Sequence, residues 1–310
     1  MRALVVSNML PDPAHPERGS FVRDQVAALR HLDGLDVELY EFAPGAASLA
    51  RAARRLRRHA KRRLDVVHAH YGLTAWPALA VPAHVHALTL HGTDLRHPRT
   101  RLITRAALGR IDLLATVSDA LAQELPAALR QRAQALPCGV QLDRFRAIPR
   151  EQARRALGLD PTAPCLLFAA DPARPQKRHD RAVALAAQVG VPLLTLGGVQ
   201  PTDVTLSINA ASAVLVPSER EGFGLAVLEA LACNVPVLAT PVGIHTEALA
   251  DLPGTLCAPF DLDRWSQALA PLLAEPDPRV AGRVRAERWS AERMAQRVAS
   301  AWCVARERAG

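Results

Sequence analysis

The sequence predicts an α/β protein of two Rossmann-like domains, each a doubly wound parallel sheet, that face each other across a cleft. Its 310 residues suit two domains of about 150 residues better than a single hydrophobic core. Short apolar runs of strand composition alternate with longer helical patterns, which is typical of βαβ units. The alternation lapses once, between Pro137 and Pro149, and then begins again. Two tandem domains of one class follow from these observations.

The first domain is expected to cover residues 1–149. Its apolar runs indicate strands, with helices filling the gaps between them. The strands are expected at residues 3–6, 37–42, 66–68, 87–90 and 113–117. The segment between the two prolines is then the crossing into the second domain, because no regular periodicity continues through it.

The second domain is expected over residues 150–288 and repeats the pattern. Its strands are expected at residues 165–170, 192–196, 213–216 and 235–239, with a helix near 178–189. From Leu262 onward the chain reads as helix almost throughout. The last part, residues 289–310, is expected to pack back on the first domain as a C-terminal helix. Packing anchors at helical spacing in this tail are Trp265, Leu269, Leu272, Leu273, Trp289, Met294, Val298 and Trp302.

Composition narrows the class of protein. Aromatic residues make up only 4% of the chain, and positive charge gathers in one run, so nucleic acid is not an expected partner. Five cysteines, an odd number without a CxxC pair, are typical of free thiols in a reducing compartment. No apolar stretch approaches the length of a membrane span or of a signal-peptide core. We therefore expect a cytoplasmic protein.

Positive charge is concentrated in the first half of the chain. Residues 1–150 carry 22 Lys and Arg against 13 Asp and Glu, whereas residues 151–310 carry 16 against 17. Much of the excess lies in the run from Arg51 to Arg63, which has no acidic residue. On a helix, one face of this run would hold Arg51, Arg54, Arg55, Arg58 and Arg62. Such a stripe is either a solvated face or a peripheral contact with the anionic inner face of a membrane.

The segment from Pro217 to Ala230 has the pattern of an anion site. An apolar strand leads into a glycine-containing turn, and a helix begins near Gly224, so free backbone N–H groups are expected at the helix start. Gly222 and Gly224 allow a diphosphate to approach the backbone closely. Glu221 and Glu229 can accept hydrogen bonds from hydroxyl groups. A ligand with a diphosphate between two sugars would satisfy all of these groups.

This segment, with the run that follows it to Val237, resembles the retaining glycosyltransferases of family 4, which have the two-Rossmann GT-B fold. The shared features are E-x7-E and the run E-A-(small or apolar)-x-x-G-x-P-V, with Asn234 at the usual glycine. The resemblance implies that Glu221 holds hydroxyls of the transferred sugar and that Glu229 binds the nucleotide ribose. Residues that would meet the sugar and the diphosphate are Gly222, Phe223, Gly224 and Leu225.

Matches in the first half extend the resemblance over nearly the whole chain. Gly19-Ser20 resembles the family's first glycine loop, which approaches the donor phosphates. Asp65–His70 resembles its D-V-(V/I)-H-x-H strand end, and His91 begins a segment similar to its H-G-x-D loop. His91 would contact the donor sugar. Of the strand-end histidines, His68 is expected to be structural, and the role of His70 stays open.

The second phosphate site departs from the family pattern, which is Arg, four residues and then Lys. Lys177 aligns with the lysine, but Pro172 occupies the arginine position. Arg174 is the expected substitute cation, and Arg178 is a third candidate. The stretch 168–178 resembles a subgroup related to teichuronic-acid-type polysaccharide glycosyltransferases. We therefore expect Arg174 and Lys177 to act on the leaving diphosphate.

The resemblance implies a hexosyltransferase of polysaccharide biosynthesis. It would move a hexose from a UDP- or GDP-sugar to a glycan, a lipid-linked or a small-molecule acceptor, with retention of configuration. The catalytic residues would be Glu221, His91, Arg174 and Lys177. No metal or bound cofactor is expected, because helix capping explains the close pair Asp261 and Asp263. Two alternatives stay open, a sugar-nucleotide epimerase of the same fold and an inactive sugar-nucleotide-binding protein.

Overall fold

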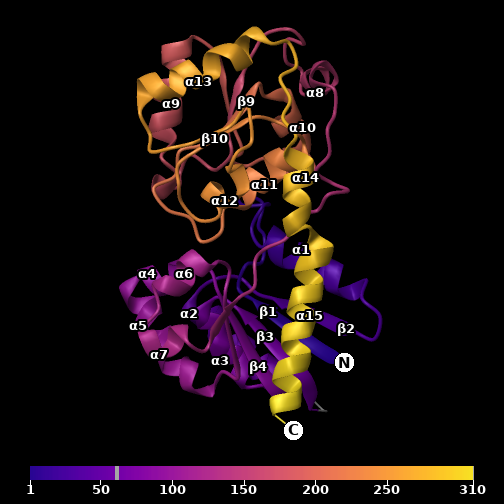
Figure 1. The fold of residues 1–310 in the computed structure, drawn as a ribbon. Coiled ribbons are helices and arrows are strands. Elements are labelled where there is room, and N and C mark those ends of the chain that lie inside the picture. The colour runs from indigo at the N-terminus through magenta and orange to yellow at the C-terminus, as the bar shows by residue number, and fades with distance from the viewer. Residues whose placement is uncertain (60–62, 310) are drawn as a thin grey trace. The chain divides into compact units, whose positions relative to one another are not determined.

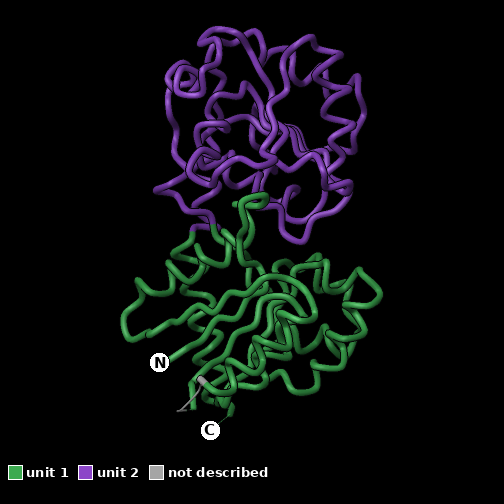
Figure 2. Tube along the Cα trace, turned by 180° about the vertical axis from the view of Figure 1, so that it is seen from behind, with its two compact units in different colours: residues 1–139, 291–310 green, residues 140–290 purple. Residues whose placement is uncertain are grey.

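The computed structural model describes residues 1–59 and 63–309, which fold into helices and parallel strands (Figure 1). The chain forms two compact units, shown in different colours in Figure 2. Unit 1 combines Met1–Gly139 with the C-terminal Ala291–Gly310, and unit 2 is Val140–Ser290. The chain therefore enters unit 2 inside the expected crossing, earlier than residue 149.

Unit 1 is built on a parallel sheet with strand order β2-β1-β3-β4-β5-β6. Its strands are β1 Arg2–Ser7, β2 Asp36–Glu41, β3 Leu64–His70, β4 Ala83–Leu90, β5 Leu113–Thr116 and β6 Ala133–Ala135. The sequence pattern predicts β1 to β5, with ends that differ by a few residues, and misses β6. The doubly wound class predicted for this domain is confirmed.

The direction of each strand connection decides which face of this sheet a helix covers. Parallel connections are right-handed, so steps in opposite directions along the sheet place their helices on opposite faces. The step from β1 to β2 carries α1 (Ser20–Arg30), and the reverse steps carry α2 (Ala46–His59), α3 (Ala75–Leu79) and α5 (Pro98–Ala107). These three therefore share the face opposite α1, and α3 contacts both α2 and α5. Shorter helices are η1 Gly72–Thr74, α4 Thr93–Arg96, η2 Leu108–Arg110, α6 Asp119–Gln123 and α7 Ala127–Arg130.

The C-terminal helix α15 (Ala291–Arg308) packs on unit 1, which confirms the expected return of the chain. Met294, Val298 and Trp302 are buried in one core with α1 and with side chains of β1, β3 and β4. Trp302 also donates its indole N–H to Nδ1 of His68 over 3.1 Å. This tryptophan is therefore a packing anchor that ties the tail to the strand β3.

Unit 2 is a second parallel sheet, with strand order β11-β10-β9-β7-β8. Its strands are β7 Leu166–Phe168, β8 Leu193–Thr195, β9 Ala213–Val216, β10 Val237–Ala239 and β11 Leu256–Cys257. The first four lie where the sequence predicts strands, and β11 is unpredicted. Its helices are α8 Arg150–Ala156, η3 Pro175–Lys177, α9 His179–Val189, α10 Val204–Ala210, α11 Leu225–Ala232, α12 His245–Leu249, α13 Leu262–Ala274, α14 Gly282–Ala286 and η4 Glu287–Trp289.

The helical tail of unit 2 is less continuous than predicted. Helix α13 ends at Ala274, and α14 begins only at Gly282, because the proline-rich stretch between them cannot continue a helix. Trp265 anchors α13 in the core of the unit, where it is fully buried. Asp261 caps α13 by accepting the backbone N–H of Arg264 over 2.8 Å, so the capping explanation holds for this acid.

Candidate active site

The turn between β9 and α11 has the shape expected of an anion site. Gly224 has φ +109° in the left-handed region, and α11 begins at the next residue, Leu225. The N-cap residue Gly224 has no side chain to cap this helix start, so the first backbone N–H groups of α11 can meet a ligand. Phe223 is buried, whereas Gly222 and Leu225 are half-buried. Glu229 follows on α11 itself and is also half-buried.

A second loop, which the sequence analysis missed, holds this turn in place. It follows β10 and runs from Thr240 to His245. The backbone N–H of Ile244 donates to the carbonyl oxygen of Phe223 over 2.9 Å, and the Thr240 hydroxyl donates to the carbonyl of Ser218. A glycine four residues after the predicted strand, Gly243 with φ +60°, was the available signal. The two loops therefore form one rigid edge at the carboxyl end of the sheet.

His245 ends that second loop as the first residue of α12, and its side chain is fully buried. Its Nδ1 lies 2.8 Å from the carbonyl oxygen of Thr240, which can only accept, so Nδ1 carries the proton. Its Nε2 is buried without a partner among the described residues. Burial lowers the pKa of His245 against the raising effect of nearby Glu221. A neutral imidazole therefore lies directly beside the Gly224 backbone, where any Cβ would be 2.5 Å from Nε2.

Lys177 and Glu221 form a buried ion pair. Nζ of Lys177 lies 2.6 Å from Oε1 of Glu221, and the two side chains are 11% and 9% exposed. The Ser218 hydroxyl donates to the same oxygen over 2.8 Å. Burial acts to raise the pKa of Glu221, but the charge of Lys177 and these hydrogen bonds outweigh it and hold the pKa below its usual value. The carboxylate is therefore ionised beside a fixed cation.

The other expected cations are placed differently. Arg174 is exposed at the start of η3, two residues before Gln176. Arg178 pairs with Asp180 over 2.6 Å and with Glu219 over 2.7 Å. Of the three candidates, Lys177 is the one that the structure brings to Glu221.

In unit 1, Gly19 and Ser20 form the start of α1. Gly19 is buried with φ +71°, and a Cβ at this position would overlap the carbonyl oxygen of Met9, so only glycine fits. Nearby, Arg23 donates to Glu41 over 3.1 Å. Burial raises the pKa of Glu41, and the charge of Arg23 opposes this. The first glycine loop is therefore held in a single backbone conformation.

His91 lies in a cluster of aromatic rings in unit 1. Its Nε2 is 3.0 Å from Nδ1 of His70, and its ring stacks on Tyr71 with centroids 4.5 Å apart. The carboxylate of Asp94 accepts the backbone N–H of His91 and, over 2.8 Å, that of Gly92. Burial lowers the pKa of His70 to about 3 and that of His91 well below its usual value. Both rings are therefore neutral at physiological pH.

His68 behaves as the structural residue that the sequence analysis expects. Its side chain is fully buried. Nε2 lies 2.7 Å from the hydroxyl of Thr89, and Nδ1 accepts from Trp302. Both ring nitrogens are thus occupied by groups of the fold itself, so this histidine has no nitrogen left for a ligand.

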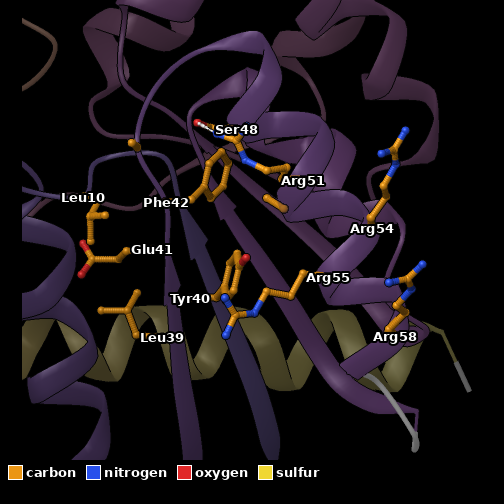
Figure 3. Close-up of a pocket in the computed structure, with 12 residues that line it drawn as sticks. Leu10, Leu39, Tyr40, Glu41, Phe42, Ser48, Arg51, Arg54, Arg55 and Arg58 are labelled. Atoms are coloured by element: carbon orange, nitrogen blue, oxygen red, sulfur yellow. Dashed lines mark hydrogen bonds between the residues drawn. The ribbon is translucent and has the colours of Figure 1, made fainter.

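A pocket of about 880 Å³ lies beside α2 in unit 1 (Figure 3). Its walls are Tyr40 at the carboxyl end of β2, Phe42 just after that strand, and the basic helix predicted from the charge run. Ala52 and Leu56 bury the inner side of this helix. The exposed arginines that line the pocket are Arg51, Arg54, Arg55 and Arg58. Arg62, the fifth member of the expected stripe, lies outside the described residues.

The two-sheet architecture matches solved glycosyltransferases of the GT-B fold. Sucrose-phosphate synthase from Thermosynechococcus elongatus superposes with a TM-score of 0.78 at 20% identity, covering 97% of this chain and 98% of its own. HepE from Anabaena, solved in complex with UDP, has a TM-score of 0.69 at 14% identity and covers 97% of this chain and 99% of its own. At these identities the match shows the fold, which is that of a two-domain GT-B glycosyltransferase.

Sequence comparison gives the family. The model "Glycosyltransferase Family 4" matches residues 4–144, and "Glycosyl transferases group 1" matches residues 151–289. The D-inositol 3-phosphate glycosyltransferase of Mycolicibacterium paratuberculosis is 31% identical over 86% of this chain and 71% of its own. That of Actinosynnema mirum is 32% identical over 89% and 79%, whereas the chain spans only 60% of the Segniliparus rotundus protein. The chain belongs to the group 1, family 4 glycosyltransferases.

Proposed function

We propose that this glycosyltransferase moves a hexose from a nucleotide-diphosphate sugar to its acceptor with retention of configuration and without a metal ion. The observation that carries the proposal is the Lys177–Glu221 pair, buried in the same unit as the uncapped start of α11. A departing diphosphate needs fixed positive charge, which a lysine and a helix N-terminus supply. A carboxylate next to that charge can accept sugar hydroxyls.

The proposed roles divide the donor into parts. Glu229 accepts hydrogen bonds from the ribose, and Glu221 from hydroxyls of the transferred sugar. Lys177 and Arg174 stabilise charge on the leaving diphosphate. Residues proposed by resemblance to contact the phosphates or the sugar are Gly19, Ser20, His91, Gly222, Phe223, Gly224 and Leu225.

The names of related proteins suggest the first substrates to test. HepE has been solved with UDP-glucose, so UDP-glucose is the first donor, followed by GDP-sugars. Relatives are named for D-inositol 3-phosphate, so a phosphorylated polyol is the first acceptor. Glycan and lipid-linked acceptors come next, because the stretch 168–178 resembles the teichuronic-acid subgroup of polysaccharide biosynthesis. The free cysteines of the chain support a cytoplasmic location for this reaction.

A ligand screen followed by a transfer assay tests this function. Thermal unfolding with a panel of sugar nucleotides identifies the donor, because a tight ligand raises the melting temperature. Transfer is then measured with and without EDTA, and NMR of the new glycosidic bond gives its configuration. We expect retained configuration and full activity in EDTA. Strict dependence on a divalent ion would refute the metal-free mechanism, and epimerised donor without transfer would favour the epimerase alternative.

Two variants divide binding from transfer in the same assays. Glu229→Ala should weaken the binding of the free nucleoside diphosphate, because its proposed partner is the ribose. Glu221→Gln should lower turnover and leave that affinity nearly unchanged, because its partner is the sugar. Calorimetric titration with UDP and GDP gives the affinities. Equal loss of nucleotide binding in both variants would contradict this division of roles.

We also propose that the basic run from Arg51 to Arg63 contacts an anionic membrane surface. None of the described helices is long and apolar enough to cross a membrane. The support is the row of exposed arginines on α2, each of which adds about 1 kcal/mol near an anionic surface.

Cosedimentation with liposomes tests the contact. Replacing Arg51, Arg54, Arg55 and Arg58 by Gln is expected to weaken binding to anionic vesicles strongly, and added salt should do the same. The matched control replaces four exposed arginines of other elements, Arg155, Arg264, Arg297 and Arg308. Equal binding of both fourfold variants would return the run to the status of a solvated face.

A further inference from the structure

Two large apolar side chains are exposed next to each other on α5. Leu102 is 72% exposed and Ile103 is 44% exposed. Thr104 and Ala107, three residues apart on this helix, are buried and hold α5 on unit 1. Ala106, one turn after Leu102, is exposed as well. The helix therefore presents an apolar strip to water.

The segment that carries this strip is cationic. Residues 95–111 contain no acidic residue. Arg99, Arg101 and Arg105 are exposed on α5, and within the described part of the chain none of them makes an ion pair. A strip of Leu and Ile bordered by uncompensated arginines is the composition of a helix that lies in the headgroup region of an anionic bilayer. A neutral or basic partner would not match these charges.

Trp76 stands at the edge of the same strip. It belongs to α3, is half-buried, and donates its indole N–H to the carbonyl oxygen of Ile103 over 3.2 Å. The guanidinium of Arg110 lies 5.9 Å from the centre of its ring. An amphipathic ring between an apolar strip and a cation suits the boundary between acyl chains and headgroups.

We propose that α5 inserts Leu102 and Ile103 into the surface of an anionic lipid bilayer, as the apolar anchor of unit 1. The proposal rests on the membrane contact proposed above and names its insertion site. Helices α2, α3 and α5 cover the same face of the unit 1 sheet, and α3 contacts both α2 and α5. The arginines of α2 supply attraction that salt screens, whereas insertion of α5 supplies burial that salt does not screen.

Trp76 provides the readout. The other tryptophans, Trp265, Trp289 and Trp302, are buried. Vesicles of phosphatidylcholine with phosphatidylglycerol, some carrying bromine on the acyl chains, are mixed with the full-length protein. We expect bromine to quench Trp76 fluorescence with anionic vesicles, and quenching to persist in part at high salt. Binding without quenching would overturn insertion and leave only the charge-driven contact of α2. No binding to any vesicle would overturn both.

Matched serine substitutions identify the anchor. Leu102→Ser with Ile103→Ser should lower vesicle partitioning at least about tenfold and remove the salt-resistant part. The control is Val284→Ser with Val183→Ser in unit 2, whose side chains are 72% and 47% exposed. Equal partitioning of the two double variants would overturn the proposal. Light scattering without vesicles tests whether a second copy of the chain covers this strip instead. A dimer that dissociates on the Leu102 and Ile103 substitutions, but not on the control substitutions, would also overturn the proposal. These measurements do not depend on turnover, so they test the insertion even if the catalytic proposal fails.

Discussion

Lys177→Met is expected to destabilise unit 2 and remove most turnover. Adding Glu221→Gln to this variant is expected to restore the stability but not the turnover. The wild-type pair joins Nζ and Oε1 over 2.6 Å, with little exposure of either side chain. Without the lysine, a buried carboxylate loses its charge partner, which costs about 3–5 kcal/mol. Glu221→Gln removes that charge but keeps an acceptor for the Ser218 hydroxyl. Chemical denaturation of the wild type, the single variant and the double variant measures the difference.

Turnover should not recover in the double variant. The cation proposed to stabilise the departing diphosphate is missing from it, so turnover should stay at least about tenfold below wild type. Arg178→Met is the matched control, because this arginine pairs with the exposed acids Asp180 and Glu219. Exposed pairs contribute about 0–1 kcal/mol, so its stability should change little. Recovery of turnover in the double variant would remove Lys177 from catalysis.

The pH dependence of stability provides an independent test of the ion pair between Lys177 and Glu221. In the wild type the folded-state pKa of Glu221 lies below its ordinary value of 4.5, so its contribution is present above 4.5 and is lost as pH falls through the folded pKa. In Lys177→Met, burial acts without that cation and raises the pKa. This variant should therefore gain stability relative to wild type as pH falls from neutral toward 4.5, and Glu221→Gln should abolish the gain. Melting temperatures of the wild type and the variants across this pH range test the prediction. Parallel curves for the wild type and Lys177→Met would contradict the pairing.

The sequence predicts β2 and β8, although both are partly buried strands at a sheet edge. Most of the other strands that it predicts are buried on both faces. In a parallel sheet covered by helices, such strands must be continuous apolar runs, and β9 is buried at every position. Strand β6 reads Ala-Gln-Ala and is only partly buried, and β11 has two residues. Both lie at a sheet edge and exist through backbone pairing with β5 and β10. Edge strands of this kind leave no pattern in the side chains, so they escape prediction.

The candidate site also has a part that the sequence predicts and a part that it does not. The E-x7-E segment was recognisable because the turn, the helix start and both glutamates lie on one continuous stretch of chain. The partner of Glu221 was not, because Lys177 lies 44 residues earlier and meets it only through the tertiary fold. His245 was missed for the same reason. Its place against Gly224 depends on how the loop after β10 crosses the turn after β9.

Surface features were predicted only in part. The basic helix α2 follows from charge spacing, since arginines three and four residues apart share a face. The apolar strip of α5 does not follow, because a helix that carries both Leu102 and Thr104 gives no indication of which one faces the core. In the structure Thr104 is fully buried and Leu102 is exposed. Exposure of this kind is a property of packing and not of composition.

Gly224→Ala is expected to abolish nucleotide binding. Gly224 has φ +109°, a conformation in which alanine is strained by about 1–3 kcal/mol. The added Cβ would also lie 2.5 Å from Nε2 and 2.6 Å from Cδ2 of His245, which is buried and bonded to Thr240. The start of α11 must therefore move, and with it the N–H groups proposed to bind the diphosphate.

Two further variants separate the strain from the overlap. Gly190→Ala places a methyl group at φ +69° at the end of α9 with nothing within 4 Å, so it should lose about 1–2 kcal/mol of stability and no nucleotide affinity. Adding His245→Ala to Gly224→Ala removes the overlap but not the strain, so affinity should recover only in part. Calorimetric titration with the donor nucleotide and thermal unfolding measure both quantities. If Gly224→Ala bound the nucleotide as tightly as Gly190→Ala does, the start of α11 would not be the diphosphate site, and Lys177 and Arg174 would have to stabilise the leaving group without it.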